Sequence, residues 1–198
     1  MYAGPRFCIP EEFTEEFTVT TTVRRAVSAD AELLHELARA TFALACPPGT
    51  TPEAIAEFIA EHLSVESFHS YLNDPKRAIL IGEVEGQPAG YVLFDSTEPS
   101  DPDVVTALTV RPTIELSKCY VLSGFHGAGV APALVSTGIE QARKQEFAAV
   151  WLGVNQENVR ANRFYAKMGF RLAGTKKFRV GERWEDDYVR ELVFGVNS

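Results

Sequence analysis

Between residues 119 and 131 the sequence reads Cys-Tyr-Val-Leu-Ser-Gly-Phe-His-Gly-Ala-Gly-Val-Ala. An extended apolar segment breaks into glycines here and then continues as a helix. Gly127 and Gly129 let the backbone turn without Cβ clashes, while the unpaired N–H groups and the positive dipole end of the following helix point outward. The segment therefore predicts a loop that binds a phosphate or pyrophosphate group.

The helix after this loop is indicated by apolar residues at the i, i+3, i+4 and i+7 spacing of one buried face. These residues are Ala131, Leu134, Val135, Gly138, Ile139 and Ala142. Pro132 falls in the first turn, where a missing N–H costs little, so the glycines precede the helix. Glycine pairs also occur in plain turns, so this loop taken alone leaves both interpretations open.

A second helix with a recognisable start and stop lies between Gln156 and Phe170. Asn158 suits its start, and Gly169 followed by Phe170 is typical of a left-handed stop with its hydrophobic contact. One face of this helix carries Ala161, Phe164, Tyr165 and Met168.

These two segments resemble the signature motifs of the GNAT superfamily, the Gcn5-related N-acetyltransferases. The acetyl-CoA loop of that family reads Arg or Gln, two residues, Gly, one residue, then Gly or Ala, and this chain matches it except at His126. The helix motif Asn-x-x-Ala-x-x-Phe-Tyr-x-x-x-Gly-Phe matches from Asn158 to Phe170 without departure. The resemblance covers roughly Arg24 to Phe194 and is weakly closest to the bacterial Pai-type spermidine/spermine acetyltransferases.

The resemblance implies acetyl-CoA as cosubstrate and gives roles to residues of this chain. The pyrophosphate would lie against His126, Gly127, Ala128, Gly129, Val130 and Ala131. The pantetheine arm would pair with the strand edge at Tyr120, Val121 and Leu122 and approach Asn158. Asn155 either meets substrate or merely ends a turn. Tyr165 matches the family's general acid, which protonates the departing thiolate, and its alternative role is that of a core aromatic.

The acceptor amine must lose its charge before it can attack, which calls for a carboxylate acting directly or through water. Glu115 is the leading candidate. It lies on the strand that carries the cosubstrate, matches a glutamate common in the family, and alternates onto one face with Ser117 and Cys119. An ordinary half-exposed strand glutamate is the alternative interpretation, and His69 is a further candidate base.

The predicted activity is transfer of the acetyl group of acetyl-CoA to a primary amine, a polyamine or another small amine, by direct attack in a ternary complex. The alternatives are a protein or peptide N-terminal acetyltransferase and a non-catalytic acyl-CoA sensor with the same fold. A dinucleotide-binding fingerprint fails because Pro132 replaces its third glycine. An acidic turn near the last strand either attracts a polyamine or is a solvated hairpin; it contains Glu182, Glu185, Asp186 and Asp187.

The expected fold class is α/β (α+β), a GNAT-like mixed, mostly antiparallel sheet of six or seven strands with a central parallel pair and flanking helices. We expect strands over residues 19–25, 78–84, 89–94, 114–122, 148–154, 171–179 and 184–194, and over 104–110 a strand that continues or returns from its neighbour. Early helices are expected over 29–45, from Thr51 with Pro52 at its first position, and from Ser64. The strand, helix, strand order from 114 to 154 makes the central pair parallel, because a crossover connection is needed.

Composition fits one soluble enzyme, with 198 residues, 45% of them hydrophobic, and a net charge of −8. The acidic balance argues against nucleic acid as a partner. No apolar stretch suits a bilayer and no signal pattern begins the chain, so we expect no membrane partner and a cytoplasmic protein. Cys8, Cys46 and Cys119 lack metal or disulfide spacing, so no metal site is expected. We expect a loosely attached extension over 1–18 and a single acetyltransferase domain over 19–198; a homodimer is left open.

Overall fold

The computed structural model describes residues 20–46, 49–180 and 183–195. The extension expected over residues 1–18, together with Cys8 and Glu182, lies outside these ranges. The strands are β1 (Thr21–Arg25), β2 (Arg77–Val84), β3 (Gln87–Asp95), β4 (Thr113–Val121), β5 (Ala149–Asn155), β6 (Arg171–Val180) and β7 (Arg183–Val193). The helices are α1 (Ala31–Ala45), α2 (Pro52–His62), α3 (Val65–Asn73), α4 (Pro102–Ala107), α5 (Val130–Lys144) and α6 (Val159–Lys167), with 3₁₀ turns at Ser28–Asp30 and Ser123–Phe125.

The strands form one seven-stranded sheet in the order β1-β2-β3-β4-β5-β7-β6. Every neighbouring pair is antiparallel except β4 and β5, which are joined by the crossover helix α5 and run parallel. The predicted mixed sheet with a central parallel pair is therefore confirmed, with seven strands.

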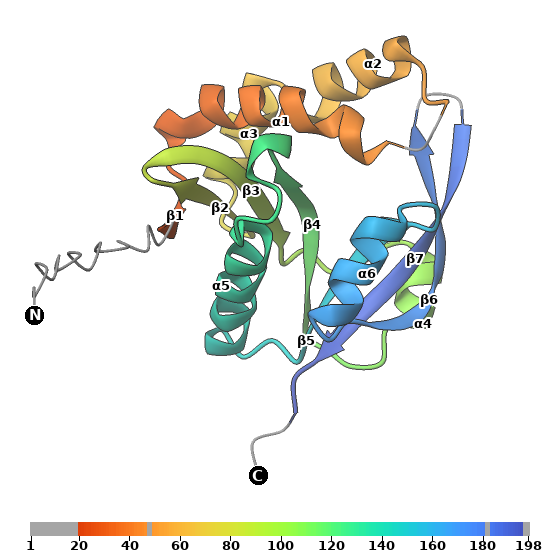
Figure 1. Ribbon diagram of the computed structural model, residues 1–198. Coiled ribbons are helices and arrows are strands. Elements are labelled where there is room, and N and C mark those ends of the chain that lie inside the picture. Colours follow the sequence, from red (N-terminus) through yellow and green to blue (C-terminus); the bar gives the residue numbers. More distant parts are fainter. Residues whose placement is uncertain (1–19, 47–48, 181–182, 196–198) are drawn as a thin grey trace, which may run out of the picture.

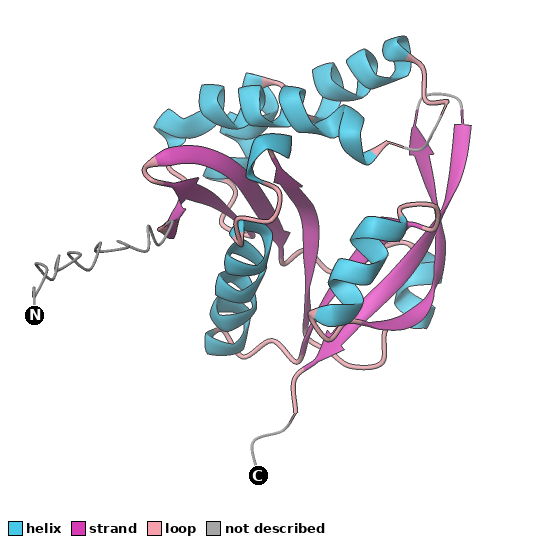
Figure 2. Ribbon diagram, in the orientation of Figure 1, coloured by secondary structure: helices cyan, strands magenta, loops and turns pink. Residues whose placement is uncertain are grey.

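Helices cover both faces of this sheet (Figures 1 and 2). On one face, Leu134 of α5 and Tyr165 of α6 belong to the same buried cluster as the inward residues of the central strands. On the other face, a second cluster joins Leu34 of α1 and Phe68 of α3 to Tyr91 of β3. A smaller cluster beneath α4 includes Trp151. The core is thus split by the sheet, as helix-on-sheet packing requires.

Side-chain caps fix where several helices begin. The side-chain oxygens of Thr51, Ser64 and Asn158 each accept a hydrogen bond from the backbone N–H three residues later. Such caps satisfy donors that the first helical turn leaves unpaired. Gly169 has a φ of 93° directly after α6. The predicted starts of α2, α3 and α6 and the predicted left-handed stop are confirmed.

The strand expected over residues 104–110 is wrong, because this segment begins within helix α4. Asp101 caps the helix by accepting a hydrogen bond from the Asp103 N–H at 2.9 Å, and Pro102 occupies its first turn. Val104 is buried against the sheet in the cluster that contains Trp151. The cap and one buried contact outweigh the β-propensity of the Val-Val-Thr run, which is only a weak preference.

The two halves of the sheet separate beyond a short parallel ladder, which we call the β4–β5 fork. β4 and β5 pair over Thr113–Glu115 and Ala149–Trp151. Beyond these residues β4 continues to Val121 and β5 to Asn155 without pairing with each other. Figure 1 shows the halves diverging from their common base.

An irregularity in β4 changes which side chains share a face. The register with β3 skips Ser117, since Leu116 lies opposite Phe94 and Lys118 opposite Leu93. Leu116 and Cys119 consequently pack into the same core under α5, although they are an odd number of residues apart. The expected alternation of Glu115, Ser117 and Cys119 on one face is therefore wrong, because a β-bulge shifts the pleat.

Candidate active site

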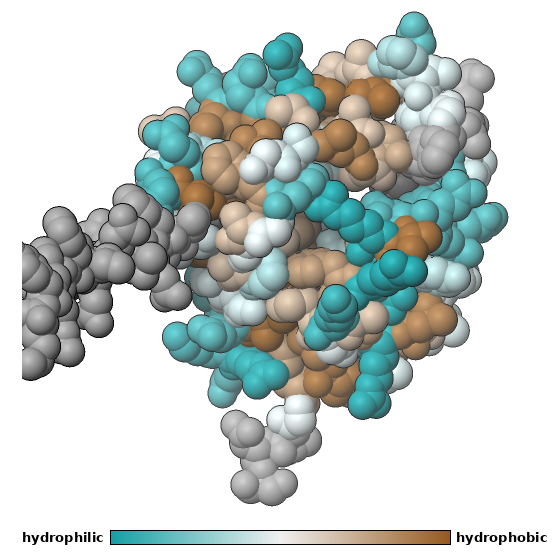
Figure 3. All heavy atoms as spheres, viewed as in Figure 1, coloured by the Kyte–Doolittle hydropathy of each residue, from teal (hydrophilic) through white to brown (hydrophobic). Residues whose placement is uncertain are grey.

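Two cavities meet at the β4–β5 fork. The first, which we call the loop cavity, has a volume of about 360 Å³ and is bordered by α1, the end of β4, the glycine loop and α6. The second, which we call the carboxylate cavity, has a volume of about 230 Å³ and lies among β4, β5, β6, β7 and the ends of α1 and α2. Both are lined by Ala45, Cys119, Tyr120, Asn158, Ala161 and Tyr165. Figure 3 shows hydrophobic residues exposed among hydrophilic side chains on this face of the molecule.

The glycine loop presents backbone donors to the loop cavity. Gly127 and Gly129 have φ values of 91° and 78°, in the left-handed region that favours glycine. Gly129 is the N-cap of α5, so its N–H and those of the first helical residues have no partner within the helix. Thr21 on β1 donates a hydrogen bond to the Ala128 carbonyl at 3.1 Å and ties the loop to the sheet. The arrangement suits an anion.

The predicted cosubstrate residues are only partly brought together. Those lining the loop cavity are Tyr120, Val121, His126, Gly127, Gly129, Ala131 and Asn158. Asn155 lines the carboxylate cavity instead. Leu122 lines neither cavity, and its N–H already donates to the Ala89 carbonyl at 2.8 Å. Ala128 and Val130 also lie outside both linings and pack against the core.

His126 is exposed, and its ring nitrogen Nε2 lies 3.0 Å from the Val121 carbonyl oxygen. The imidazole thus spans the base of the loop. A protonated Nε2 would donate to that carbonyl, so the ring contributes to loop shape as well as to the lining of the cavity.

Tyr165 stands where the two cavities join. Its side chain is buried, and its hydroxyl lies beside the thiol of Cys119 on β4. Burial raises the pKa of Tyr165 well above its ordinary value, and burial raises the pKa of the Cys119 thiol to about 11. Both groups are therefore neutral at physiological pH, and Tyr165 keeps a proton that it can donate.

Glu115 is half-buried in the wall of the carboxylate cavity. Burial raises the pKa of this carboxyl above its usual range, while the positive charges of Lys176 and Lys118 oppose the rise. A carboxyl with a raised pKa is a better proton acceptor near neutral pH than an exposed one. The structure thus places the predicted base in a cavity and beside cations.

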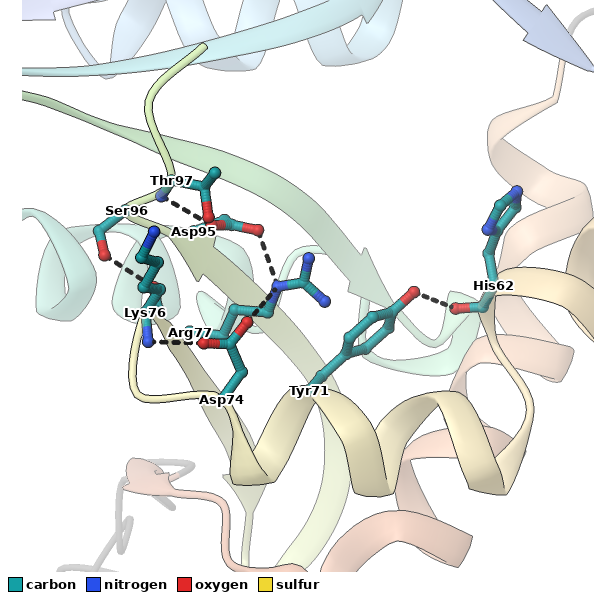
Figure 4. Close-up of polar contacts among 8 residues, drawn as sticks. All are labelled: His62, Tyr71, Asp74, Lys76, Arg77, Asp95, Ser96 and Thr97. Atoms are coloured by element: carbon teal, nitrogen blue, oxygen red, sulfur yellow. Dashed lines mark hydrogen bonds and ion pairs between the residues drawn. The ribbon is translucent and has the colours of Figure 1, made fainter. Parts of the chain in front are cut away.

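A hydrogen-bonded network supports the strand end beside Glu115 (Figure 4). Asp95 on β3 lies opposite Glu115 in the strand register and accepts a hydrogen bond from Nε of Arg77 at 2.8 Å. The Arg77 guanidinium also lies 4.5 Å from the ring centroid of Tyr71, whose hydroxyl donates to the His62 carbonyl. These contacts tie α2 and α3 to the sheet at the level of the predicted base.

Asp187 was not predicted as a site residue, yet it is buried in the wall of the carboxylate cavity. It lies on β7, opposite Asn155 of β5 and Lys176 of β6. Burial raises its pKa to about 6, against the opposing charge of Lys176. A solvated hairpin therefore does not describe this residue. The sequence indicated Asp187 only as one member of an acidic turn. Its neighbour Asp186 points the other way along β7 and forms an exposed ion pair with Lys177.

The histidines other than His126 lie away from both cavities. His69 is exposed and lines neither of them. Nδ1 of His35 lies 2.7 Å from the Leu63 carbonyl, and the His62 ring packs edge-on against Phe58. The structure thus does not bring the alternative base His69 to the site. No helix within the described ranges has the length and hydropathy needed to cross a bilayer.

Comparison with known proteins places this arrangement among enzymes. Residues 34–170 match the family described as Acetyltransferase (GNAT) family. An uncharacterized N-acetyltransferase of Mycobacterium tuberculosis is 45% identical over 166 residues, covering 83% of this chain and 99% of its relative. The PaiA N-acetyltransferase of Thermoplasma acidophilum, solved in complex with coenzyme A, superimposes with a TM-score of 0.70 at 17% identity, over 88% of this chain and 99% of that one. A ribosomal-protein-alanine N-acetyltransferase of Brucella melitensis gives a TM-score of 0.66 at 24% identity, over 87% and 99%.

Proposed function

We infer the function from one premise, which is that this chain belongs to the GNAT family of acetyltransferases. It is an N-acetyltransferase that uses acetyl-CoA as cosubstrate. We propose that its acceptor is the primary amine of a small cationic molecule, such as a polyamine, and that the amine attacks acetyl-CoA directly in a ternary complex. We further propose that residues 19–198 act as a single acetyltransferase domain.

The carboxylate cavity is the observation that carries this proposal. Glu115, Glu185 and Asp187 line it from two different strands together with Lys118 and Lys176, so acidic side chains outnumber basic ones in its wall. Carboxylates in a partly dry cavity attract an ammonium group far more strongly than they would in water. The cavity meets the loop cavity at Tyr165, so a bound amine lies next to a group held in the loop cavity.

The loop cavity supports the placement of acetyl-CoA. Its glycine loop and the first turn of α5 supply the N–H groups that a pyrophosphate needs. The unpaired edge of β4 at Tyr120 and Val121 suits the amide groups of the pantetheine arm, which resembles an extended peptide. This orientation puts the acetyl group at the junction of the cavities, beside Tyr165.

Glu115 in the carboxylate cavity and Tyr165 at the junction supply the proton transfers that acetyl transfer requires. Glu115 takes a proton from the ammonium and frees the nitrogen lone pair, which forms the C–N bond at the acetyl carbonyl. Collapse of the tetrahedral intermediate then breaks the C–S bond. Tyr165 donates its proton to the departing thiolate, a role consistent with a hydroxyl that remains protonated throughout the physiological pH range.

A CoA-release assay with purified protein tests this proposal. The acceptors are spermidine, propylamine, amino acids and a peptide with a free N-terminus, all at a saturating concentration of acetyl-CoA. We expect spermidine to give the highest kcat/KM. Faster release with the peptide would replace the small-amine proposal with N-terminal acetylation, and no release with any amine would refute the acceptor class.

A variant pair sharpens the assay. Glu185→Gln removes a carboxylate from the cavity wall, so we expect it to raise KM for spermidine while leaving propylamine, which has a single ammonium, nearly unchanged. Asp186→Asn is the matched control, because its exposed carboxylate pairs with Lys177 outside the cavity. Equal effects of the two substitutions would contradict polyamine binding by the cavity.

A further inference from the structure

The carboxylate cavity contains a buried acid that takes no part in the proton transfers described above. Asp187 is only 6% exposed, and its Oδ1 is buried without a hydrogen-bond partner in the described part of the chain. A buried carboxylate oxygen of this kind is costly unless it carries a proton or meets a donor. Oδ1 of Asp187 is therefore stabilised by binding a proton or by a hydrogen-bond donor from a ligand.

Lys176 lies near this acid, with its side chain over a glycine. A Cβ added to Gly153 on β5 would come within 2.6 Å of Cε of Lys176 and 3.3 Å of Oδ2 of Asp187. The lysine side chain thus extends from β6 past β7 to β5, and the missing side chain of Gly153 provides the space. The positive charge of the same lysine lowers the pKa of both Glu115 and Asp187, and all three residues line the carboxylate cavity.

Amide formation removes two protons from the acceptor nitrogen at different steps, so two proton acceptors can act in turn. The acceptor enters as R–NH₃⁺ and leaves as R–NH–CO–CH₃, so its nitrogen loses two protons while the C–N bond forms and the C–S bond breaks. One proton must leave before attack and the second must leave the tetrahedral intermediate. The thiolate takes one proton from Tyr165, which regains it from the site, and the other goes to solvent.

We infer that Asp187 is a second proton acceptor for the acceptor nitrogen, beside Glu115, and that Lys176 positions its carboxylate across Gly153. This inference rests on the proposed function. Asp187 lines the same cavity as Glu115 and comes from the opposite half of the sheet, so a nitrogen between the two halves faces both acids. Lys176 is a positioning residue, since it acts on the amine through the acids.

The groups around Asp187 define the pH dependence. Glu185 and Asp186 on its own strand raise its pKa, and Lys176 from β6 lowers it; burial is the largest influence and brings the pKa to about 6. From β4 and α6 the cavity also presents Glu115, Lys118 and the neutral Cys119 and Tyr165. Asp187 is therefore mostly ionised at neutral pH, ready to accept a proton, and becomes protonated as the pH falls through 6.

The test compares Asp187→Asn with Asp186→Asn, and Lys176→Met with Lys177→Met. We expect kcat/KM of the unmodified enzyme to rise with pH through about 6, and Asp187→Asn to remove this limb and lower kcat roughly 10²-fold. Lys176→Met should move the limb to higher pH, because a cation that favours the carboxylate is lost. The neighbouring exposed pair, Asp186 and Lys177, should leave the profile in place, and Asp187→Glu should recover part of the activity.

A titration without substrate keeps the inference separate from the proposed function. Carboxyl ¹³C NMR of the unmodified protein should show a group titrating near pH 6 that disappears in Asp187→Asn and shifts upward in Lys176→Met. An active enzyme whose Asp187→Asn variant keeps both kcat and the acidic limb would overturn the inference, as would the absence of this titration. Loss of amine acetylation in the unmodified enzyme, with the titration present, would instead refute the proposed function.

Discussion

The Tyr165 hydroxyl on α6 lies beside the Cys119 thiol on β4, where the two halves of the sheet separate. This contact joins the helix to the strand at the point where the two cavities meet. Because burial keeps both groups neutral, the tyrosine retains its proton beside the thiol. Tyr165 is thus positioned by Cys119 and remains available as a donor.

Tyr165→Phe removes the hydroxyl and leaves the packing of the ring. We expect kcat to fall toward the low end of the roughly 10²–10⁴-fold range for acid catalysis, because a thiolate is a tolerable leaving group even unassisted. The melting temperature should change little, and both quantities should be measured on the same preparation. Cys119→Ala is the matched control, since it removes the polar neighbour of the hydroxyl but keeps the proton donor. A loss of kcat in Cys119→Ala as large as that in Tyr165→Phe would assign the hydroxyl a structural role.

Glu115→Gln keeps the size of the side chain and removes its ability to accept a proton. If Glu115 acts as the first base, turnover should fall by roughly 10²–10⁴-fold while the Kd for acetyl-CoA stays near that of the unmodified protein. Stopped assays and calorimetry measure the two quantities. Unchanged turnover would leave Asp187 as the sole base in the cavity.

Gly129→Val places a branched residue at a φ of 78° beside the N–H groups of α5. The strain and the added side chain should abolish acetyl-CoA binding, measured by calorimetry. His126→Ala should weaken binding only modestly, because backbone amides supply most of the contacts. Gly124→Ala is a suitable control, since a Cβ at Gly124 meets nothing within 4 Å and its φ is not positive. A larger loss of acetyl-CoA affinity in His126→Ala than in Gly129→Val would contradict this account of the loop.

The raised pKa of Asp187 also makes a prediction for stability. Its pKa is about 6 when folded and 3.8 for an unperturbed carboxyl, so protonation favours the folded state. This contribution is complete below the unfolded value and is lost as the pH rises through 6. The free energy of unfolding of the unmodified protein, relative to Asp187→Asn, should therefore fall by about 3 kcal/mol from acidic to neutral pH. Urea unfolding over this range checks it, and parallel pH curves for the two proteins would contradict it.

Local signals predicted most of the fold. The caps at Thr51 and Asn158 and the stop at Gly169 depend on residues close in sequence, so their physical causes are visible in the chain. The error at α4 had a signal of the same type, since Asp101 and Pro102 repeat the cap-then-proline pattern of α2. The prediction of a strand rested on the β-branched residues that follow this cap, whose β-propensity is only a weak preference.

The site was less accessible to sequence reasoning because its composition depends on long-range register. Glu115 was predicted from its strand and from a glutamate common in the family that the chain resembles, and Tyr165 from that family's helix motif; Glu115 lines the carboxylate cavity and Tyr165 lines both cavities. Asp187 enters the cavity only because β7 pairs with β5 on one side and β6 on the other, which brings it opposite Asn155 and Lys176. No spacing along the chain encodes that pairing. The bulge near Ser117, which changes the face of every later β4 residue, was equally hidden.

The β4–β5 fork leaves a strand edge open in the middle of the sheet. Within the described residues, parallel pairing joins the halves over Thr113–Glu115, so much of β4 has no strand neighbour on that side. Amide protons that face the opening should exchange rapidly with deuterium in the free protein. A ligand arm that pairs with this edge of β4 like an extra strand would slow the exchange of these amide protons. If the arm also contacts β5, the amide protons of β5 should be slowed with them, and the two halves of the sheet should then open as one cooperative unit.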